Sequence, residues 1–328
     1  MKNNSLIMFT LVALLAILPA CKKENASPPN VYIAGNTTAG AQVWKNGTST
    51  ILSGTATVAT GLYVSGTNVY VSGYRIQGGT NVALYWKNGV AVDLSNGSQN
   101  ASTSGIFISG TDVYVSGFEY NSTKQVAKYW KNGIAVNLSN GTNNAYAKGI
   151  FVKGTDVYVA GDEESGTGQV AKYWKNGVEV ILPYAGAVNG IFSTGIFVDA
   201  NGVYASGYSD LGSQTVGLRW INGTPVLIGS VVTSVYASNG NVYVADYEDT
   251  GPTWQAQYFK NDDVVYLSDR TSDVWANSIF VYGTDVYVAG RARAGAAWEL
   301  KAWKNGDPVT LTNVTSITPA SVAGIFVL

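Results

Sequence analysis

Three tryptophans stand outside the repeated aromatic positions of the chain and lie close in sequence to charged side chains. Rigid aromatic groups beside carboxylates and guanidinium groups are typical of surfaces that bind carbohydrate or peptide, because aromatic side chains supply much of the binding energy. The alternative is that these tryptophans fill a wider gap around the shortest repeat, between Trp220 and Phe259. The predicted ligand-binding surface comprises Trp254, Trp275, Trp298, Glu163, Glu164, Tyr247, Glu248, Asp249, Arg291 and Arg293.

The chain contains no histidine, which excludes Ser-His-Asp and Cys-His catalysis and histidine-based metal sites. It also shows no helical periodicity and no glycine-rich phosphate loop, so we predict no catalytic residue, no metal ligand and no cofactor. Carboxylates remain, and glycoside hydrolysis needs two of them about 5–5.5 or 6.5–9.5 Å apart. We therefore predict a non-enzymatic binding or scaffold module for glycan or protein. The alternative is a carboxylate-dependent glycan-active enzyme, a hydrolase or a lyase.

Residues 1–20 have the pattern of a bacterial export signal, with Lys2 before an apolar run from Leu6 to Leu18. The run is shorter than the roughly 20 residues that span a bilayer. Its end resembles a lipobox, Leu-Pro-Ala-Cys, so we predict that Cys21, the only cysteine of the sequence, is lipidated after cleavage. The alternative is an ordinary signal peptide with a chance cysteine. Residues 21–29 then comprise the lipidated cysteine and a flexible tether.

The charges of the chain nearly cancel, with 20 basic and 21 acidic residues interspersed. Nothing in this balance favours a nucleic-acid partner. We expect a monomer whose partners are the membrane, through the N-terminal lipid, and a glycan or an envelope protein. The expected location is the bacterial cell envelope at the outer membrane, and the sequence leaves open which leaflet carries the protein.

A string around an aromatic residue recurs seven times and determines the predicted fold. Each repeat of about 44 residues contains four strand-like pieces, and Asn-Gly between two such pieces is a strong hairpin signal. This period with four strands is that of a propeller blade. We predict an all-β, seven-bladed β-propeller over residues 30–328, with four antiparallel strands per blade. The string is Trp-Lys-Asn-Gly or a variant, at Trp44, Trp86, Trp130, Trp174, Trp220, Phe259 and Trp303.

The two ends of the chain complement each other. The first repeat begins at Asn30 and lacks its first strand, while Gly324 to Leu328 reads as that strand with nothing after it. We predict that the C-terminal strand completes blade 1, because such closure removes open sheet edges. Both termini then lie on the face that carries the Lys and Asx turns, and the variable loops point away from the membrane.

The repeated residues are better explained by structure than by ligand binding. We expect the aromatic row to pack between blades rather than form a binding platform. We expect the repeated Asx residues to bond the backbone of their own turns, with calcium ligation as the alternative. The repeated lysines are expected to be exposed charges partly offset by Asp, with a basic ring as the alternative.

The Gly-Ile-Phe-Val, Val-Tyr-Val-Ala-Gly and Tyr-Trp-Lys-Asn-Gly strings resemble repeats of Bacteroidetes-type surface lipoproteins over residues 21–328. The resemblance implies a propeller exposed on the outer membrane. It gives no activity that could be transferred to this chain. The placing of Tyr and Trp is also similar to kelch repeats, but the kelch Gly-Gly pair is reduced here to one Gly. Only the architecture is therefore expected to be shared with kelch proteins.

Overall fold

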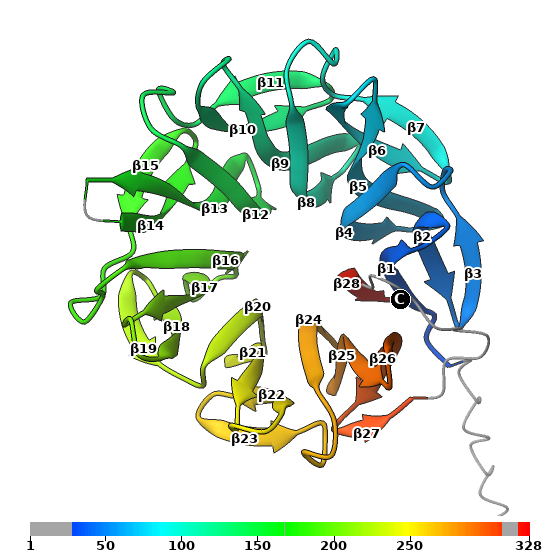
Figure 1. The fold of residues 1–328 in the computed structure, drawn as a ribbon, viewed down its shortest axis with the longest axis vertical. Helices are drawn as coiled ribbons and strands as arrows, with labels where there is room; N and C mark the ends of the chain where they lie inside the picture. The colour runs from blue at the N-terminus through cyan, green and yellow to red at the C-terminus, as the bar shows by residue number, and fades with distance from the viewer. Residues whose placement is uncertain (1–27, 167, 310–320) are drawn as a thin grey trace, which may run out of the picture.

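The computed structural model describes residues 28–309, apart from residue 167, and residues 321–328. The predicted signal peptide, Cys21 and most of the predicted tether lie outside the described residues. Within them the chain folds into β-strands arranged as blades around one axis (Figure 1). The described residues include no helix long and apolar enough to cross a membrane.

The strands of the described residues fall by their pairing into seven sets of four, numbered here as blades 1 to 7. From the axis outward, the first strands are β28 (Ser321–Val327), β4 (Thr57–Ser65), β8 (Ala101–Ser109), β12 (Ala145–Lys153), β16 (Gly190–Val198), β20 (Val231–Ser238) and β24 (Val274–Tyr282). The second strands are β1 (Val31–Thr37), β5 (Asn68–Gln77), β9 (Asp112–Tyr120), β13 (Asp156–Ser165), β17 (Val203–Asp210), β21 (Asn241–Asp249) and β25 (Asp285–Ala294).

The third strands are β2 (Gly40–Lys45), β6 (Thr80–Lys87), β10 (Gln125–Lys131), β14 (Gly168–Lys175), β18 (Thr215–Ile221), β22 (Trp254–Lys260) and β26 (Ala297–Lys304). The outer strands are β3 (Thr48–Ile51), β7 (Val90–Asp93), β11 (Ile134–Asn137), β15 (Val178–Ile181), β19 (Thr224–Leu227), β23 (Asp263–Tyr266) and β27 (Asp307–Pro308). Pairing within each set is antiparallel, which confirms the predicted all-β propeller of four-stranded sheets. One parallel pair, Gln169 with Gly190, joins blades 4 and 5 into a single eight-stranded sheet.

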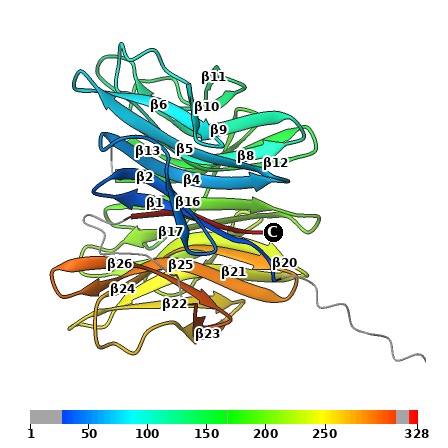
Figure 2. The ribbon, with the colours of Figure 1, turned by 90° about the vertical axis from the view of Figure 1, so that its right-hand side faces the viewer.

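The C-terminal strand closes the ring, as predicted. β28 pairs antiparallel with β1, with Ile33 opposite Ile325. The backbones of Asn30 and Leu328 exchange two hydrogen bonds of 2.6 and 3.0 Å. In the side view the C-terminus lies on the right-hand side of the ring (Figure 2). Because Asn30 also contacts the Asn46 turn, both ends of the propeller lie on the face that we call the Lys/Asx face.

The repeated tryptophans form the core between blades. The six tryptophans of the row are at most 4% exposed, and in blade 6 the smaller Phe259 takes the same register opposite Val244. Burial of such large rings supplies most of the apolar area that holds neighbouring blades together. The prediction that this row is structural rather than a binding platform is confirmed.

The Asn of each Trp-Lys-Asn-Gly turn adopts a positive φ, near 50° at Asn132, as a two-residue hairpin turn requires. Its side chain also ties the hairpin to its neighbour, since Asn132 Oδ1 accepts from the Val113 N–H and Nδ2 donates to Asp112. Our expectation that the repeated Asx residues bond their own turns is therefore wrong in most blades. They accept instead from the Asn of the next hairpin, which fixes two turns with one side chain.

The axis is filled by a closed ring of aromatic side chains, one from each first strand. Neighbouring ring centroids lie 4.5–5.0 Å apart, as tilted aromatic pairs prefer. In six of the seven blades the residue directly before the aromatic contributes to the lining of a cavity of about 210 Å³ on the axis. The ring residues are Tyr63, Phe107, Phe151, Phe197, Tyr236, Phe280 and Phe326.

Candidate functional site

The face opposite the Lys/Asx face carries the loops between second and third strands, and we call it the variable-loop face. Here four aromatic side chains of blades 6 and 7 form one continuous row. Tyr247 contacts Trp254 and Trp275 edge-on, at 5.4 and 6.1 Å between centroids, and Trp275 stacks on Trp298 at 4.2 Å. The structure thus joins the three tryptophans that the sequence singled out.

Two arginines lie against this aromatic row. The guanidinium of Arg291 lies 4.3 Å from the ring centre of Trp275 and 5.0 Å from that of Trp298. Arg293 approaches Trp298 at 6.0 Å. Burial among the rings lowers the pKa of Arg291, and Tyr247 partly offsets this effect. Cation–π contact of this kind restrains the arginines and the tryptophans together.

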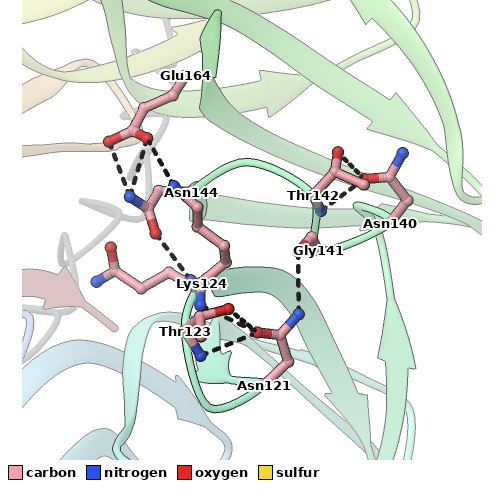
Figure 3. A network of polar contacts seen from close by, with 9 residues as sticks. Asn121, Thr123, Lys124, Asn140, Gly141, Thr142, Asn144 and Glu164 are labelled. Atoms are coloured by element: carbon pink, nitrogen blue, oxygen red, sulfur yellow. Dashed lines mark hydrogen bonds and ion pairs between the residues drawn. The ribbon is translucent and has the colours of Figure 1, made fainter.

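Asp273, which the sequence reasoning missed, positions both ends of this row. Its Oδ1 accepts from the backbone N–H of Trp254 at 3.2 Å, and its Oδ2 pairs with Arg293 at 3.5 Å. Asn144 repeats this arrangement between blades 3 and 4: Oδ1 accepts from the Gln125 N–H, and Nδ2 donates to Glu164 (Figure 3). The residue before the first strand is therefore Asn144 in blade 4, where it contacts the acidic Glu164. In blade 7 the equivalent residue is Asp273, which contacts the basic Arg293.

A groove of about 730 Å³ opens beside Trp254, between blades 5 and 6. Trp254 supplies its aromatic wall, and Gln214, Ser213 and Thr215 supply amide and hydroxyl groups. No lysine or arginine lines the groove among the residues that the structure describes. Its charged lining is entirely acidic and consists of Asp210, Glu248 and Asp249.

Glu163 and Glu164, which we predicted as part of the ligand-binding surface, lie near the end of β13 in blade 4 and contact other side chains. Glu163 pairs with the buried Lys172 at 2.8 Å, and Glu164 accepts two hydrogen bonds of 2.9 Å from Asn144. Their strand β13 lies across the ring from β25 and β26 (Figure 1). Blade 5 separates blade 4 from the aromatic row. The repeat places both acids in blade 4, and the structure adds their partners, Lys172 and Asn144.

Asp162 is the most unusual carboxylate of the variable-loop face and was not among the predicted site residues. Only 2% of it is exposed, and its Oδ2 accepts no hydrogen bond from the described residues. Burial raises its pKa to about 6, against the opposing effects of Lys148 and the Ser193 N–H. Burial raises the pKa of Tyr208, and the negative charge of Asp162 adds to this shift. A partial signal existed in the sequence, because five other blades hold a large side chain at the equivalent position (Tyr74, Phe118, Tyr208, Tyr247 or Arg291), while blade 1 holds Asn36.

A second buried carboxylate, Asp246, has a structural role. It is 0% exposed and accepts hydrogen bonds from Gln257 Nε2 at 2.7 Å and the Ser230 N–H at 3.1 Å. Burial raises its pKa to about 6. Both oxygens are thereby satisfied without a ligand, which sets Asp246 apart from Asp162.

The variable-loop face combines aromatic, acidic and basic side chains. Across residues 28–309 and 321–328, residue 167 apart, no group of three or more acidic or cysteine side chains is placed to hold a metal ion. The face contains the acidic groove beside Trp254 and the stacked pair Trp275 and Trp298, which contacts Arg291.

No family model matches the chain, and no curated protein sequence matches it. Among solved structures it is similar to the Trypanosoma rangeli sialidase in complex with sialic acid, at 9% identity and a TM-score of 0.48, over 83% of this chain and 56% of that one.

Two further structures have the same degree of likeness. TolB from Acinetobacter baumannii aligns at 9% identity and a TM-score of 0.46, over 90% of this chain and 67% of that one. The Pyrococcus horikoshii acylaminoacyl peptidase aligns at 12% identity and a TM-score of 0.46, over 77% and 45%. Because the sequence identities and TM-scores are this low, the chemistry of the site is derived from the residues of this chain alone.

Proposed function

We propose that the protein is a non-enzymatic binding module that recognises glycan through the groove beside Trp254. The observation that carries the proposal is the composition of the groove, in which one tryptophan faces carboxylates, an amide and hydroxyls. A sugar ring presents an apolar face that packs on an aromatic side chain and hydroxyls that donate to carboxylates. A largely apolar peptide would leave these polar groups unpaired, at a cost in affinity.

The charge of the groove narrows the class of glycan. Asp210, Glu248 and Asp249 meet no basic residue in the described lining. A uronic or sialic acid would add a like charge to this site, which costs affinity. We therefore expect neutral sugars or sugars with a free amine.

The proposal is tested with a form that begins at Lys22, which retains every strand of the propeller. We expect it to bind neutral or amino-bearing glycans on an array. Trp254→Ala should weaken that binding about tenfold or more, because aromatic anchors are typical hot spots. Tyr282→Ala, which removes an exposed aromatic at the far end of β24 on the opposite face, is the matched control.

Thermal melting separates recognition from packing. Lost binding by Trp254→Ala with an unchanged Tm supports the proposal, whereas a fall in Tm that accounts for the loss would show that Trp254 packs the fold. Absence of glycan binding by the unmodified form would overturn the proposal and favour an envelope protein as the partner.

A glycan-active enzyme is the second candidate, and Asp162 is the observation that favours it. A carboxyl whose pKa is about 6 can stay protonated long enough to act as a general acid. Such an enzyme also needs a second carboxylate close to the first. The groups that act most on Asp162 are instead Lys148 and the Ser193 N–H, and neither is a carboxylate. Product release from a bound glycan, lost in Asp162→Asn, would support this candidate; unchanged glycan after prolonged incubation would exclude it for that ligand.

We also propose that the module is lipid-anchored through Cys21 at the cell envelope. Support comes from the lipobox-like string and from the position of Asn30, where the chain enters the propeller on the Lys/Asx face. With the tether on that face, the groove beside Trp254 points away from the membrane. Labelling of the wild type and Cys21→Ala with a fatty-acid probe tests the anchor.

A further inference from the structure

The charged turn residues of the Lys/Asx face are unevenly distributed between its two halves. Its turns in blades 1–4 carry more lysine than Asp, and its turns in blades 5–7 carry more Asp than lysine. In the first half the charged turn residues are Lys45, Lys87, Lys131, Lys153 and Lys175 against Asp112 and Asp156. In the second half they are Lys260 and Lys304 against Asp199, Asp262, Asp263, Asp285 and Asp307, with Arg219 reaching Asp262 from within blade 5.

The lysines of the positive half differ in their partners. Lys131 and Lys175 pair with Asp112 and Asp156 at 3.0 and 2.8 Å. The equivalent lysines of blades 1 and 2 face Asn30 and Asn68 in place of Asp, and each lies over a tyrosine ring at about 5.5 Å. Among the described residues, Lys45 and Lys87 therefore form no ion pair, and the turns of blades 1 and 2 keep their positive charge.

Exposed apolar side chains stand on the same half. The residue after each Asn-Gly turn is Val90, Ile134 and Val178 in blades 2, 3 and 4, and these are 68, 73 and 69% exposed. The register of the hairpins puts them directly opposite Lys87, Lys131 and Lys175. In the other blades the same position holds Thr48, Thr224, Asp263 or Asp307. The three apolar tips are consecutive along the rim, on β7, β11 and β15 (Figure 1).

We propose that blades 1–4 of the Lys/Asx face form a membrane-contacting edge that binds an anionic lipid surface. Lysines flanking exposed apolar side chains suit such a surface, because the lysines attract anionic headgroups while the apolar tips enter the interfacial layer. The acidic turns of blades 5–7 are repelled by the same surface. The propeller therefore rests on one edge and tilts, with blades 5 and 6 farthest from the lipid.

The position of the chain ends agrees with this edge. Asn30 and Leu328 belong to blade 1, which borders the apolar tips of blade 2. The proposal itself rests on the charge and exposure of the turns, so it holds with or without lipidation of Cys21. It also leaves the groove beside Trp254 open, because that groove lies on the opposite face.

The test uses the form that begins at Lys22, without any lipid, in cosedimentation with vesicles. We expect binding to vesicles of mixed phosphatidylcholine and phosphatidylglycerol and at least tenfold weaker binding to phosphatidylcholine alone. The triple variant Val90→Ser, Ile134→Ser, Val178→Ser and the double variant Lys87→Glu, Lys175→Glu should each weaken the binding about tenfold. All five positions are exposed turn residues, so folding should be retained, and circular dichroism verifies this.

Two matched controls use the same kinds of change elsewhere. Ile51→Ser, Ile181→Ser, Leu227→Ser removes three exposed apolar residues from the far ends of outer strands, and Lys260→Glu, Lys304→Glu changes the acidic half. Both controls should bind vesicles like the unmodified form. Equal binding to neutral and anionic vesicles, no binding to either, or equal losses in the controls would each overturn the proposal. Glycan binding should be unchanged in all these variants, which separates this test from that of the groove.

Discussion

At the scale of single residues, Asp162 shows how position in a blade changes the chemistry of a carboxylate. Asp112 of the Lys/Asx turns is only partly buried, and hydrogen bonds from Asn132 and Lys131 lower its pKa. Asp162 is buried on the other face, where loss of water raises its pKa to about 6. The difference comes from solvation and partners rather than residue type.

This difference predicts opposite pH dependences. A carboxyl with a raised folded-state pKa binds its proton more tightly in the folded protein, so the protein loses stability as pH rises from about 4 to about 6. Asp162→Asn should remove part of this loss and raise the free energy of unfolding at pH 7 by roughly 1–3 kcal/mol, with little change at pH 4. Urea unfolding at the two pH values measures it.

Asp112→Asn is the control of opposite sign. The pKa of Asp112 is lowered in the folded state, so its contribution is present at pH 7 and is lost as pH falls below about 4. That variant should therefore be less stable than the wild type at pH 7. An Asp162→Asn variant that loses stability at pH 7 would contradict the prediction and would indicate that the ionised carboxylate is held by a favourable contact.

At the scale of strands, blade 6 departs from the others through two linked changes on β21 and β22. In blade 2 a Cβ on Gly73 would lie 2.2 Å from the backbone oxygen of Val58 and 2.5 Å from the Trp86 ring, so the neighbouring strand and the indole both crowd this position. In blade 6 the indole is replaced by Phe259, and Asp246 occupies the glycine position with Gln257 as its partner. The ring and the glycine position thus both differ in this blade, and Phe259 is smaller than the indole that contacts the equivalent position in blade 2.

The two changes should therefore couple in a double-mutant cycle. Phe259→Trp alone should destabilise by about 1–3 kcal/mol, because the indole meets Asp246. Asp246→Gly alone should also destabilise, because it leaves the buried Gln257 amide without an acceptor. Asp246→Gly with Phe259→Trp restores the arrangement of the other blades, so its loss of unfolding free energy should be smaller than the sum of the single losses by at least about 0.5 kcal/mol. Additive losses would show that the two positions are independent.

At the scale of the whole molecule, the ring is held closed by one short strand. Phe326 of β28 contacts Tyr63 at 4.9 Å and Phe280 at 4.6 Å, which completes the aromatic ring on the axis. Ile325 and Val327 of the same strand pack in the core beside Trp44 and Leu300. Blade 1 thus depends on chain ends that are far apart in sequence.

Deletion of the last five residues, Gly324–Leu328, should therefore open the ring. We expect a large fall in Tm and self-association through the exposed edge of β1, because unpaired strand edges associate. Differential scanning calorimetry and light scattering measure both effects. Adding a synthetic peptide of residues 321–328, compared with a scrambled peptide, should restore the monomer. A truncated protein that remains monomeric with the Tm of the full chain would contradict this closure.

Much of the fold could be predicted from the sequence because its signals are local. Trp-Lys-Asn-Gly specifies a buried ring followed by a hairpin turn within four residues, and the repeat multiplies that signal along the chain. The missing first strand before Asn30 and the surplus strand after Gly324 likewise predict the closure, which the pairing of β1 with β28 confirms.

The candidate site was only partly accessible in this way. The sequence identified Trp254, Trp275 and Trp298 as departures from the repeat, but only the tertiary structure joined them through Tyr247. It also showed that Glu163 pairs with Lys172 of the same blade and that Glu164 accepts from Asn144, and it revealed the burial of Asp162. The burial of a side chain and its contacts with a neighbouring blade depend on residues far away in the sequence. A local sequence pattern therefore does not predict them. Repetition therefore determined the scaffold, whereas contacts between blades determined the charge, the solvation and the partners of the residues on its variable-loop face.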